Sequence, residues 1–333
     1  MADKDWKTKA QKLRKQVRKL KRKLLGEEAA GETAAPASTA GAKVKSAKPV
    51  SPLAPKGGFP ALPVISGVEF AAIGAGIKYQ DRKDVMLVRL APGTAMAGVF
   101  TRSSTRSGCV RDGQAKLALP AAPQDGAAII VNSGNSNAFT GKLGDTAVAK
   151  ICGAVAGALD IPASRVFSSS TGVIGEPLPY EKITTRIGDL VADLREDAIE
   201  MAAQAMMTTD TFPKGAAATV QGDGGEIRIA GIAKGSGMIA PDMATMLVYI
   251  FTDARISAAN LQKMVSRHVD ATFNSITVDS DTSTSDTLLV AATGRSAAAE
   301  VKGTGPIAKA FETALHGVMR DLALQVIRDG EGA

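Results

Sequence analysis

One segment, residues 234–251, constrains this chain more than any other. It runs Lys-Gly-Ser-Gly-Met-Ile-Ala-Pro-Asp-Met-Ala-Thr-Met-Leu-Val-Tyr-Ile-Phe, so a loop rich in glycine leads directly into an apolar stretch. Glycine and proline favour loops, whereas β-branched and aromatic side chains favour strands. Thr245 stands at the junction, directly after Ala244. If the backbone were cut between these two residues, Thr245 would combine a hydroxyl nucleophile and an α-amine base in one residue.

Threonine also favours strands for its β-branched shape alone, so the residues by themselves favour a structural role for Thr245. The segment nevertheless resembles the self-cleavage site of the ornithine acetyltransferase family, the glutamate N-acetyltransferases of arginine biosynthesis. The family pattern is Lys-Gly-x-Gly-Met-Ile-x-Pro-x-Met-Ala-Thr-Met-Leu, and every fixed position is present from Lys234 to Leu247. The resemblance implies cleavage between Ala244 and Thr245, with Thr245 as the nucleophile.

A second segment, residues 168–178, is similar to the family's Ser-Thr-Gly-Val-Ile-Gly motif. The resemblance implies that Thr171 and Gly172 donate hydrogen bonds to the oxyanion of acyl transfer. Removing one such donor typically costs about 3–4 kcal/mol of transition-state stabilisation. Without the family, the glycine indicates only a junction between a strand and a turn.

Three further residues align with substrate-binding positions of the family. Thr208 belongs to Thr-Thr-Asp-Thr, which is followed by Lys214; by itself this pattern is typical of a helix end. Lys234 has the charge to bind an α-carboxylate, and Glu331 has the charge to bind the side-chain ammonium of ornithine. Taken alone, they would be a surface lysine and a solvated acid.

Two polar segments, 132–141 and 277–287, also resemble the family, but their residue types indicate only turns. The second contains three aspartates without the spacing or glycine of a calcium-binding loop. Metal ligands are scarce elsewhere, because the chain has two cysteines, Cys109 and Cys152, and two histidines, His268 and His316. We therefore expect no metal site, and a Ser-His-Asp or Cys-His system, although it stays open, has few residues to build from.

The net charge of +7 is concentrated at the N-terminus. Residues 1–23 hold eleven Lys and Arg and two Asp, which leaves the rest of the chain with a net charge of −2. Residues 1–25 show a heptad pattern of apolar residues, which predicts a basic helix. A solvated helix, a self-associating coil and an arm on nucleic acid or anionic lipid all fit it. Residues 26–56 have the composition of a disordered linker, and the body shows no basic stripe for nucleic acid.

Helical and strand-like patterns alternate through the body, without a strict βαβ repeat or a phosphate-binding glycine motif. No apolar run is long enough for a membrane span, and no secretory signal is present. The sequence predicts strands at 85–91, 96–101, 127–132, 165–169, 216–221, 226–233 and 245–251, two segments at 275–279 and 287–292 flanking a polar loop, and helices at 145–159, 180–207 (one or two), 257–273 and 306–328.

The resemblance implies an α/β fold with αββα layers, made of residues 57–244 and 245–333. It implies cytoplasmic transfer of an acetyl group from N-acetylornithine to glutamate, through an acetyl-Thr245 intermediate, by a heterotetramer of cleaved chains. No cofactor is expected, although some family members use acetyl-CoA as a second donor. Family members continue beyond Ala333 with further substrate contacts. Two alternatives stay open: an N-terminal-nucleophile aminopeptidase or amidase, and a scaffold built around the basic arm.

Overall fold

The computed structural model describes residues 49–240 and 246–332, all within a compact unit that begins at Lys48. The predicted basic helix, the predicted linker as far as Lys48, and the Ala244–Thr245 junction lie outside these residues. The body starts earlier than the predicted Gly57. Ser51 donates its backbone N–H to Thr211 Oγ1 at 3.0 Å and its hydroxyl to the carbonyl of Arg328 at 2.5 Å. Composition does not reveal these contacts with residues far along the chain.

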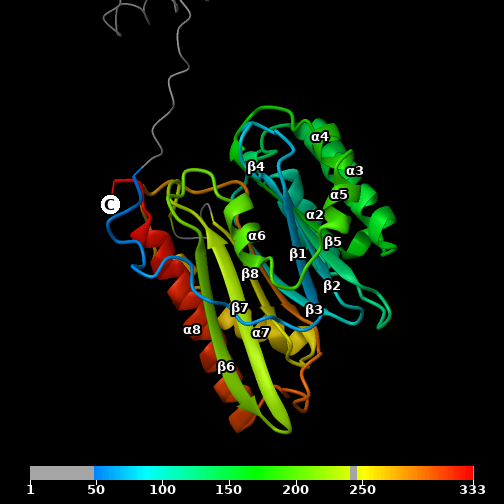
Figure 1. The fold of residues 1–333 in the computed structure, drawn as a ribbon, viewed down its shortest axis with the longest axis vertical. Coiled ribbons are helices and arrows are strands. Elements are labelled where there is room, and N and C mark those ends of the chain that lie inside the picture. The colour runs from blue at the N-terminus through cyan, green and yellow to red at the C-terminus, as the bar shows by residue number, and fades with distance from the viewer. Residues whose placement is uncertain (1–48, 241–245, 333) are drawn as a thin grey trace, which may run out of the picture. The chain divides into compact units, whose positions relative to one another are not determined.

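Two sheets form the centre of this unit (Figure 1). In the four-stranded sheet β4 pairs in parallel with β5, and the other neighbours are antiparallel. In the five-stranded sheet β8 pairs in parallel with β9, and the other neighbours are antiparallel. The first sheet has the order β1 (Val68–Ile73), β2 (Val85–Leu90), β4 (Ala127–Asn135) and β5 (Val166–Val173). The second has the order β3 (Ala95–Phe100), β9 (Thr287–Ala292), β8 (Leu247–Thr252), β7 (Gly225–Lys234) and β6 (Lys214–Gly222).

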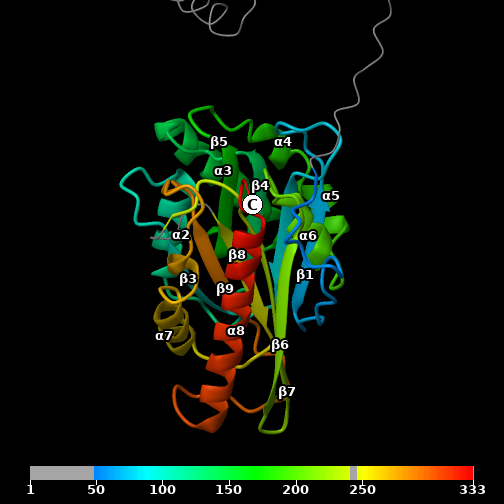
Figure 2. The ribbon, with the colours of Figure 1, turned by 90° about the vertical axis from the view of Figure 1, so that its left-hand side faces the viewer.

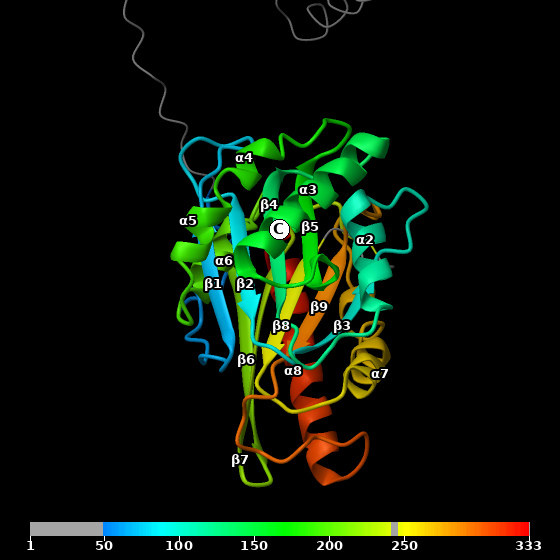
Figure 3. The same cartoon turned by 90° about the vertical axis from the view of Figure 1, so that its right-hand side faces the viewer.

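Helices cover the outer faces of both sheets. Figure 3 shows α2 to α5 on the side of the four-stranded sheet, and Figure 2 shows α7 and α8 over the five-stranded sheet. The helices are α2 (Gly108–Leu117), α3 (Gly141–Leu159), α4 (Glu181–Thr184), α5 (Ile187–Ala192), α6 (Ile199–Ala205), α7 (Ala258–His268) and α8 (Pro306–Arg328), with 3-10 turns at Ala163–Arg165 and Phe273–Ser275. None of the helices in the described ranges is long and apolar enough to cross a membrane.

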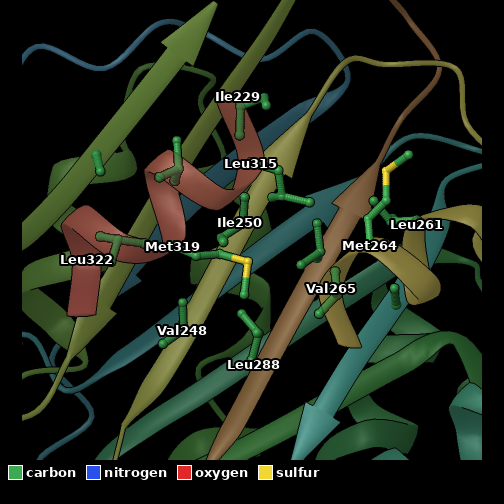
Figure 4. Close-up of a cluster of buried hydrophobic side chains, with 14 of the residues drawn as sticks. Ile229, Val248, Ile250, Leu261, Met264, Val265, Leu288, Leu315, Met319 and Leu322 are labelled. Atoms are coloured by element: carbon green, nitrogen blue, oxygen red, sulfur yellow. The ribbon is translucent and has the colours of Figure 1, made fainter. Parts of the chain in front are cut away.

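Apolar side chains fill the spaces between these layers and form three buried clusters. Between the sheets, Phe70 of β1 meets Phe251 of β8 edge to face, with ring centroids 5.1 Å apart. Helix α6 joins this central cluster through its alanines. In Figure 4, Met319 of α8 lies over β8, near Ile250 and Val248, whereas Met264 of α7 lies beside Leu261, on the side of β9 and β3. All six residues of β8 are buried, which explains why the strand is apolar up to Thr252 at its end, and the predicted αββα layering is confirmed.

Most predicted elements are present with shifted ends. The hairpin of β6 and β7 and the helix at 306–328 lie where the sequence predicts them. Residues 180–207 form three short helices rather than one or two, and the helix predicted at 257–273 ends at His268. Strand β1 and helix α2 have no counterpart in the prediction, and β5 extends to Val173, which brings its end to the polar cavity described next.

Candidate active site

A cavity of about 440 Å³ contains five of the seven predicted site residues on its wall: Thr171, Gly172, Thr208, Lys234 and Glu331. They come from the end of β5, the loop after α6, the end of β7 and the segment after α8. The other two, Ala244 and Thr245, lie outside the described ranges. Tertiary structure therefore brings together residues spread over more than half of the body.

Gly172 lies where β5 is packed directly against β4. Its φ is +132°, and a Cβ at this position would lie 2.3 Å from the carbonyl carbon of Gly134, its partner in the parallel register. Only a residue without a side chain fits such an approach, because the clashing atoms are backbone and cannot rotate away. The glycine thus sets the position of the Thr171–Gly172 backbone on the cavity wall.

Lys234 contacts Thr171 across the cavity wall. Its Nζ donates to Thr171 Oγ1 at 3.1 Å, and Lys234 is only 2% exposed. An ammonium has donors and no acceptor, so the threonine oxygen accepts and its own proton is directed elsewhere. Burial lowers the pKa of Lys234, an effect that the nearby Asp210 carboxylate opposes. The contact leaves the Thr171 hydroxyl as a donor, which an oxyanion requires.

Asp210, Lys214 and Asp329 form a buried ion cluster behind this wall. Lys214 Nζ lies 2.8 Å from Asp210 Oδ1 and 2.6 Å from Asp329 Oδ2, and all three side chains are fully buried. Burial alone would raise the pKa of Asp210, but the ammonium groups of Lys214 and Lys234 outweigh it and hold the pKa well below its usual range. Lysine is almost never fully buried unless it is paired, so the sequence alone predicts an exposed Lys214 and gives no sign of this cluster.

Glu331 approaches the cavity along the loop that follows Lys234. Its backbone N–H donates to the carbonyl of Ser236 at 2.7 Å, and a Cβ on Gly237 would lie 3.0 Å from its carboxylate carbon. Ser236 Oγ in turn lies 2.7 Å from Thr209 Oγ1. These contacts join the segment around Thr208, the loop after β7 and the segment after α8 into one wall.

The two polar segments without a predicted role also line the cavity. Ser136 of the first segment donates its N–H and its hydroxyl to the carbonyl of Val173 at 2.9 and 2.8 Å. Asp279 of the second accepts the backbone N–H groups of Met238 and Ile239, the latter at 2.9 Å. The turn predicted for the first segment is partly wrong, because residues 132–135 form the end of β4, whereas residues 277–286 of the second lie in no helix or strand. Neither pattern indicates that the segment lines the cavity. Lys78 and Tyr79 also line the cavity, and no motif in the sequence marks them.

The start of β8 is held by Asp286. Met246, the residue after Thr245, donates its N–H to Asp286 Oδ1 at 2.8 Å, and Leu247 is paired with Lys234. Asp286 is 1% exposed, and its other oxygen has no hydrogen-bond partner. Burial raises the pKa of this carboxyl well above its usual range. The register therefore brings the beginning of β8 beside the wall formed by Lys234 and Thr171.

Residues suited to metal binding do not gather at the cavity. Within the described part of the chain, no group of three or more His, Cys, Asp or Glu side chains is arranged to hold a metal ion. His268 and His316 stack on each other with ring centroids 4.6 Å apart, and neither lines the cavity.

The layered fold with its polar cavity is that of an acyl-transfer enzyme family, and residues 69–333 match the ArgJ family, to which the chain belongs. The arginine biosynthesis bifunctional protein ArgJ of Ruegeria pomeroyi is 62% identical over 284 residues, which are 85% of this chain and 68% of that protein. The protein of the same name from Nitrobacter winogradskyi is 51% identical over 288 residues, which are 85% and 69% of the two chains. The chain thus spans about two thirds of the length of these relatives.

Among solved structures, the ornithine acetyltransferase of Mycobacterium tuberculosis complexed with ornithine is 33% identical. The match covers 53% of this chain and 92% of that chain, with a TM-score of 0.47. The family that the sequence motifs resemble is therefore confirmed by the family match and the curated relatives.

Proposed function

We propose that this chain transfers an acetyl group from N-acetylornithine to glutamate, through an acetyl-Thr245 intermediate formed after cleavage between Ala244 and Thr245. Membership of the ArgJ family makes the chain an acetyltransferase of arginine biosynthesis. One observation supports the detailed assignment most: the donor pair Thr171 and Gly172 shares a cavity with the charged residues that the family resemblance assigns to substrate.

The chemistry follows from a nucleophile that brings its own base. The Thr245 hydroxyl attacks the acetyl carbonyl while its α-amine accepts the proton. The resulting oxyanion is stabilised by the Thr171 hydroxyl and the Gly172 N–H. When the tetrahedral adduct collapses, the C–N bond breaks and the ornithine amine leaves with the proton. The glutamate amine then attacks the acetyl ester, and the same groups work in reverse to release N-acetylglutamate.

Substrate binding uses the opposite charges on the cavity wall. The Lys234 ammonium has three N–H donors and donates one to Thr171, so two remain for an α-carboxylate. Glu331 lies on the same wall and suits the side-chain ammonium of ornithine, while Thr208 supplies a hydroxyl. We propose that neither a metal nor an organic cofactor takes part, and that acetyl-CoA is at most a second acetyl donor.

The sheet order supports lasting association of the two cleaved pieces. We also propose that the enzyme works in the cytoplasm as a dimer of such pairs. Strand β8 follows the cleavage point, yet it lies between β7 of the first piece and β9 of the second. Separating the pieces would expose the fully buried face of β8 and break its pairing with β7. We therefore expect the cut chains to stay together under native conditions.

The assignment is tested by intact mass and by products. The wild-type chain should give two fragments that meet at Ala244/Thr245, Thr245→Ala should stay whole, and Thr245→Ser should still cut. With N-acetylornithine as donor, N-acetylglutamate should form and depend on added glutamate. A correctly folded wild type that stays whole would refute the nucleophile. Acetate as the main product, indifferent to glutamate, would favour the aminopeptidase or amidase alternative.

A further inference from the structure

We propose that the buried cluster Asp210–Lys214–Asp329, here called the Lys214 hub, is a positioning device that sets Glu331 relative to Lys234 and thereby determines recognition of the substrate side chain. The inference rests on the proposed function, because it assigns a cause to the placement of two proposed substrate-binding residues. No member of the hub lines the cavity, so its action must pass through the residues that it holds.

One arm of the hub holds the loop around Lys234. Asp210 Oδ1 accepts the backbone N–H of Gly235 at 2.6 Å, directly after Lys234, and Oδ2 accepts the N–H of Thr208 at 2.9 Å. The same Oδ1 also accepts from Lys214 Nζ. A single carboxylate thus fixes the backbone at two predicted substrate-binding positions.

The other arm holds the segment that carries Glu331. Asp329, two residues before it, accepts Lys214 Nζ at 2.6 Å and the N–H of Thr211 at 2.9 Å, and it also accepts the Thr211 hydroxyl. Glu331 then closes the ring through its own N–H, which donates to Ser236. Among the ion pairs of the described ranges, those of Lys214 alone join these two arms.

Helix α8 makes this link rigid. It lies along β6 (Figure 2), and Gln325 of α8 donates from Nε2 to the carbonyl of Gly215 at 2.8 Å and accepts the Gly215 N–H at 3.1 Å. Gly215 is the neighbour of Lys214. Because α8 is anchored next to the hub, the step from its C-terminal end at Arg328 to Glu331 leaves little freedom.

The energetics favour a narrow geometry. Three charged groups with no exposed side-chain surface are tolerated only when each keeps its partners at hydrogen-bond distance. Loss of one carboxylate leaves a buried charge under-compensated, so the freed segment is expected to shift. For Asp329 that segment ends in Glu331, whereas the Lys234 side keeps its contacts through Asp210.

The test compares two ligands that differ only in the group that Glu331 would contact. Ornithine has a side-chain ammonium and norvaline does not, so the ratio of their dissociation constants, measured by calorimetry on the 333-residue chain, reports recognition of that group. Asp329→Asn should reduce the preference for ornithine about tenfold or more, and Glu331→Gln should do the same, since a contact between charged groups is lost. Glu312→Gln is the matched control, because Glu312 of α8 is, like Asp329, an ion-paired acid that does not line the cavity.

Thr211→Val provides a second variant in case Asp329→Asn does not fold, because it removes one hydroxyl donor and keeps all three charges of the hub. A loss of preference in Asp329→Asn or Thr211→Val, with Glu312→Gln unchanged, supports the hub. If Glu331→Gln loses the preference while both hub variants keep it, the inference is wrong and the proposed function stands. If the wild type shows no preference for ornithine, the role of Glu331 is wrong and the hub inference falls with it.

Discussion

Replacing Gly172 with alanine gives a sharp test of the donor geometry at the cavity. The added methyl group would meet three backbone atoms of β4, at 2.3 Å from Gly134 C, 2.6 Å from Asn135 N and 2.7 Å from Gly134 O. Side chains can rotate out of the way, but these atoms can yield only if β4 and β5 separate. The substitution therefore strains the pairing that places Thr171 beside Lys234.

Two effects contribute to the loss of stability. A non-glycine residue in a disfavoured backbone conformation such as this φ of +132° costs about 1–3 kcal/mol. Forcing a methyl group into a packed site costs about 1–3 kcal/mol more, and the closeness of the contacts favours the upper half of that range. We expect Gly172→Ala to lower the free energy of unfolding by about 3–6 kcal/mol.

Urea unfolding followed by circular dichroism measures this change. With a slope of about 3 kcal/mol per molar urea, the midpoint should fall by about 1–2 M. Gly153→Ala is the matched control, because Gly153 lies within α3 and a Cβ there meets nothing within 4 Å. It should gain about 0.5–1 kcal/mol from the better helix propensity of alanine. Equal midpoints for Gly172→Ala and the wild type would refute the close approach of β4 and β5.

Further predictions concern catalysis, pH dependence and thiol reactivity. Thr171→Ala should lower the acetyl-transfer rate about 10²–10³-fold with a small change in KM, whereas an unchanged rate would exclude its hydroxyl as a donor. Burial raises the pKa of Asp286, so the folded chain keeps a proton that the unfolded chain releases near pH 4. The free energy of unfolding therefore falls as the pH rises from about 4 to the raised pKa of the folded chain. Asp286→Asn should therefore be more stable than the wild type at pH 8 in urea titrations, and the gain should vanish at pH 4. Burial raises the pKa of Cys109 and raises that of Cys152 to about 11, so a thiol reagent at pH 8 should label both slowly in the native chain and rapidly in urea; fast native labelling would contradict their burial.

Local patterns determined much of the fold before any tertiary contact was considered. The hairpin of β6 and β7 follows from two strand-like runs joined by a turn rich in glycine, and the long helix at 306–328 from its apolar periodicity and its initial proline. Such signals lie within a few residues of each other, so the sequence alone reveals them. Strand β1 was not predicted, because apart from Glu69 its residues are all apolar, two of them alanines, and do not alternate with polar ones. Its pairing with β2 and with Arg195 stabilises it instead.

The candidate site, like the fold, has features that the sequence reveals and features that only the tertiary structure decides. The motifs around Thr171, Lys234 and Thr245 identify a family and its chemistry, because covalent steps need particular residue types in a particular order. The burial of Lys214 and Asp286 was decided only by the tertiary structure. Lys214 meets Asp329 across 115 positions of sequence, and Asp286 meets Met246 across 40. A charge becomes stable in the interior only when such distant partners arrive together, and no local pattern in the sequence records that encounter.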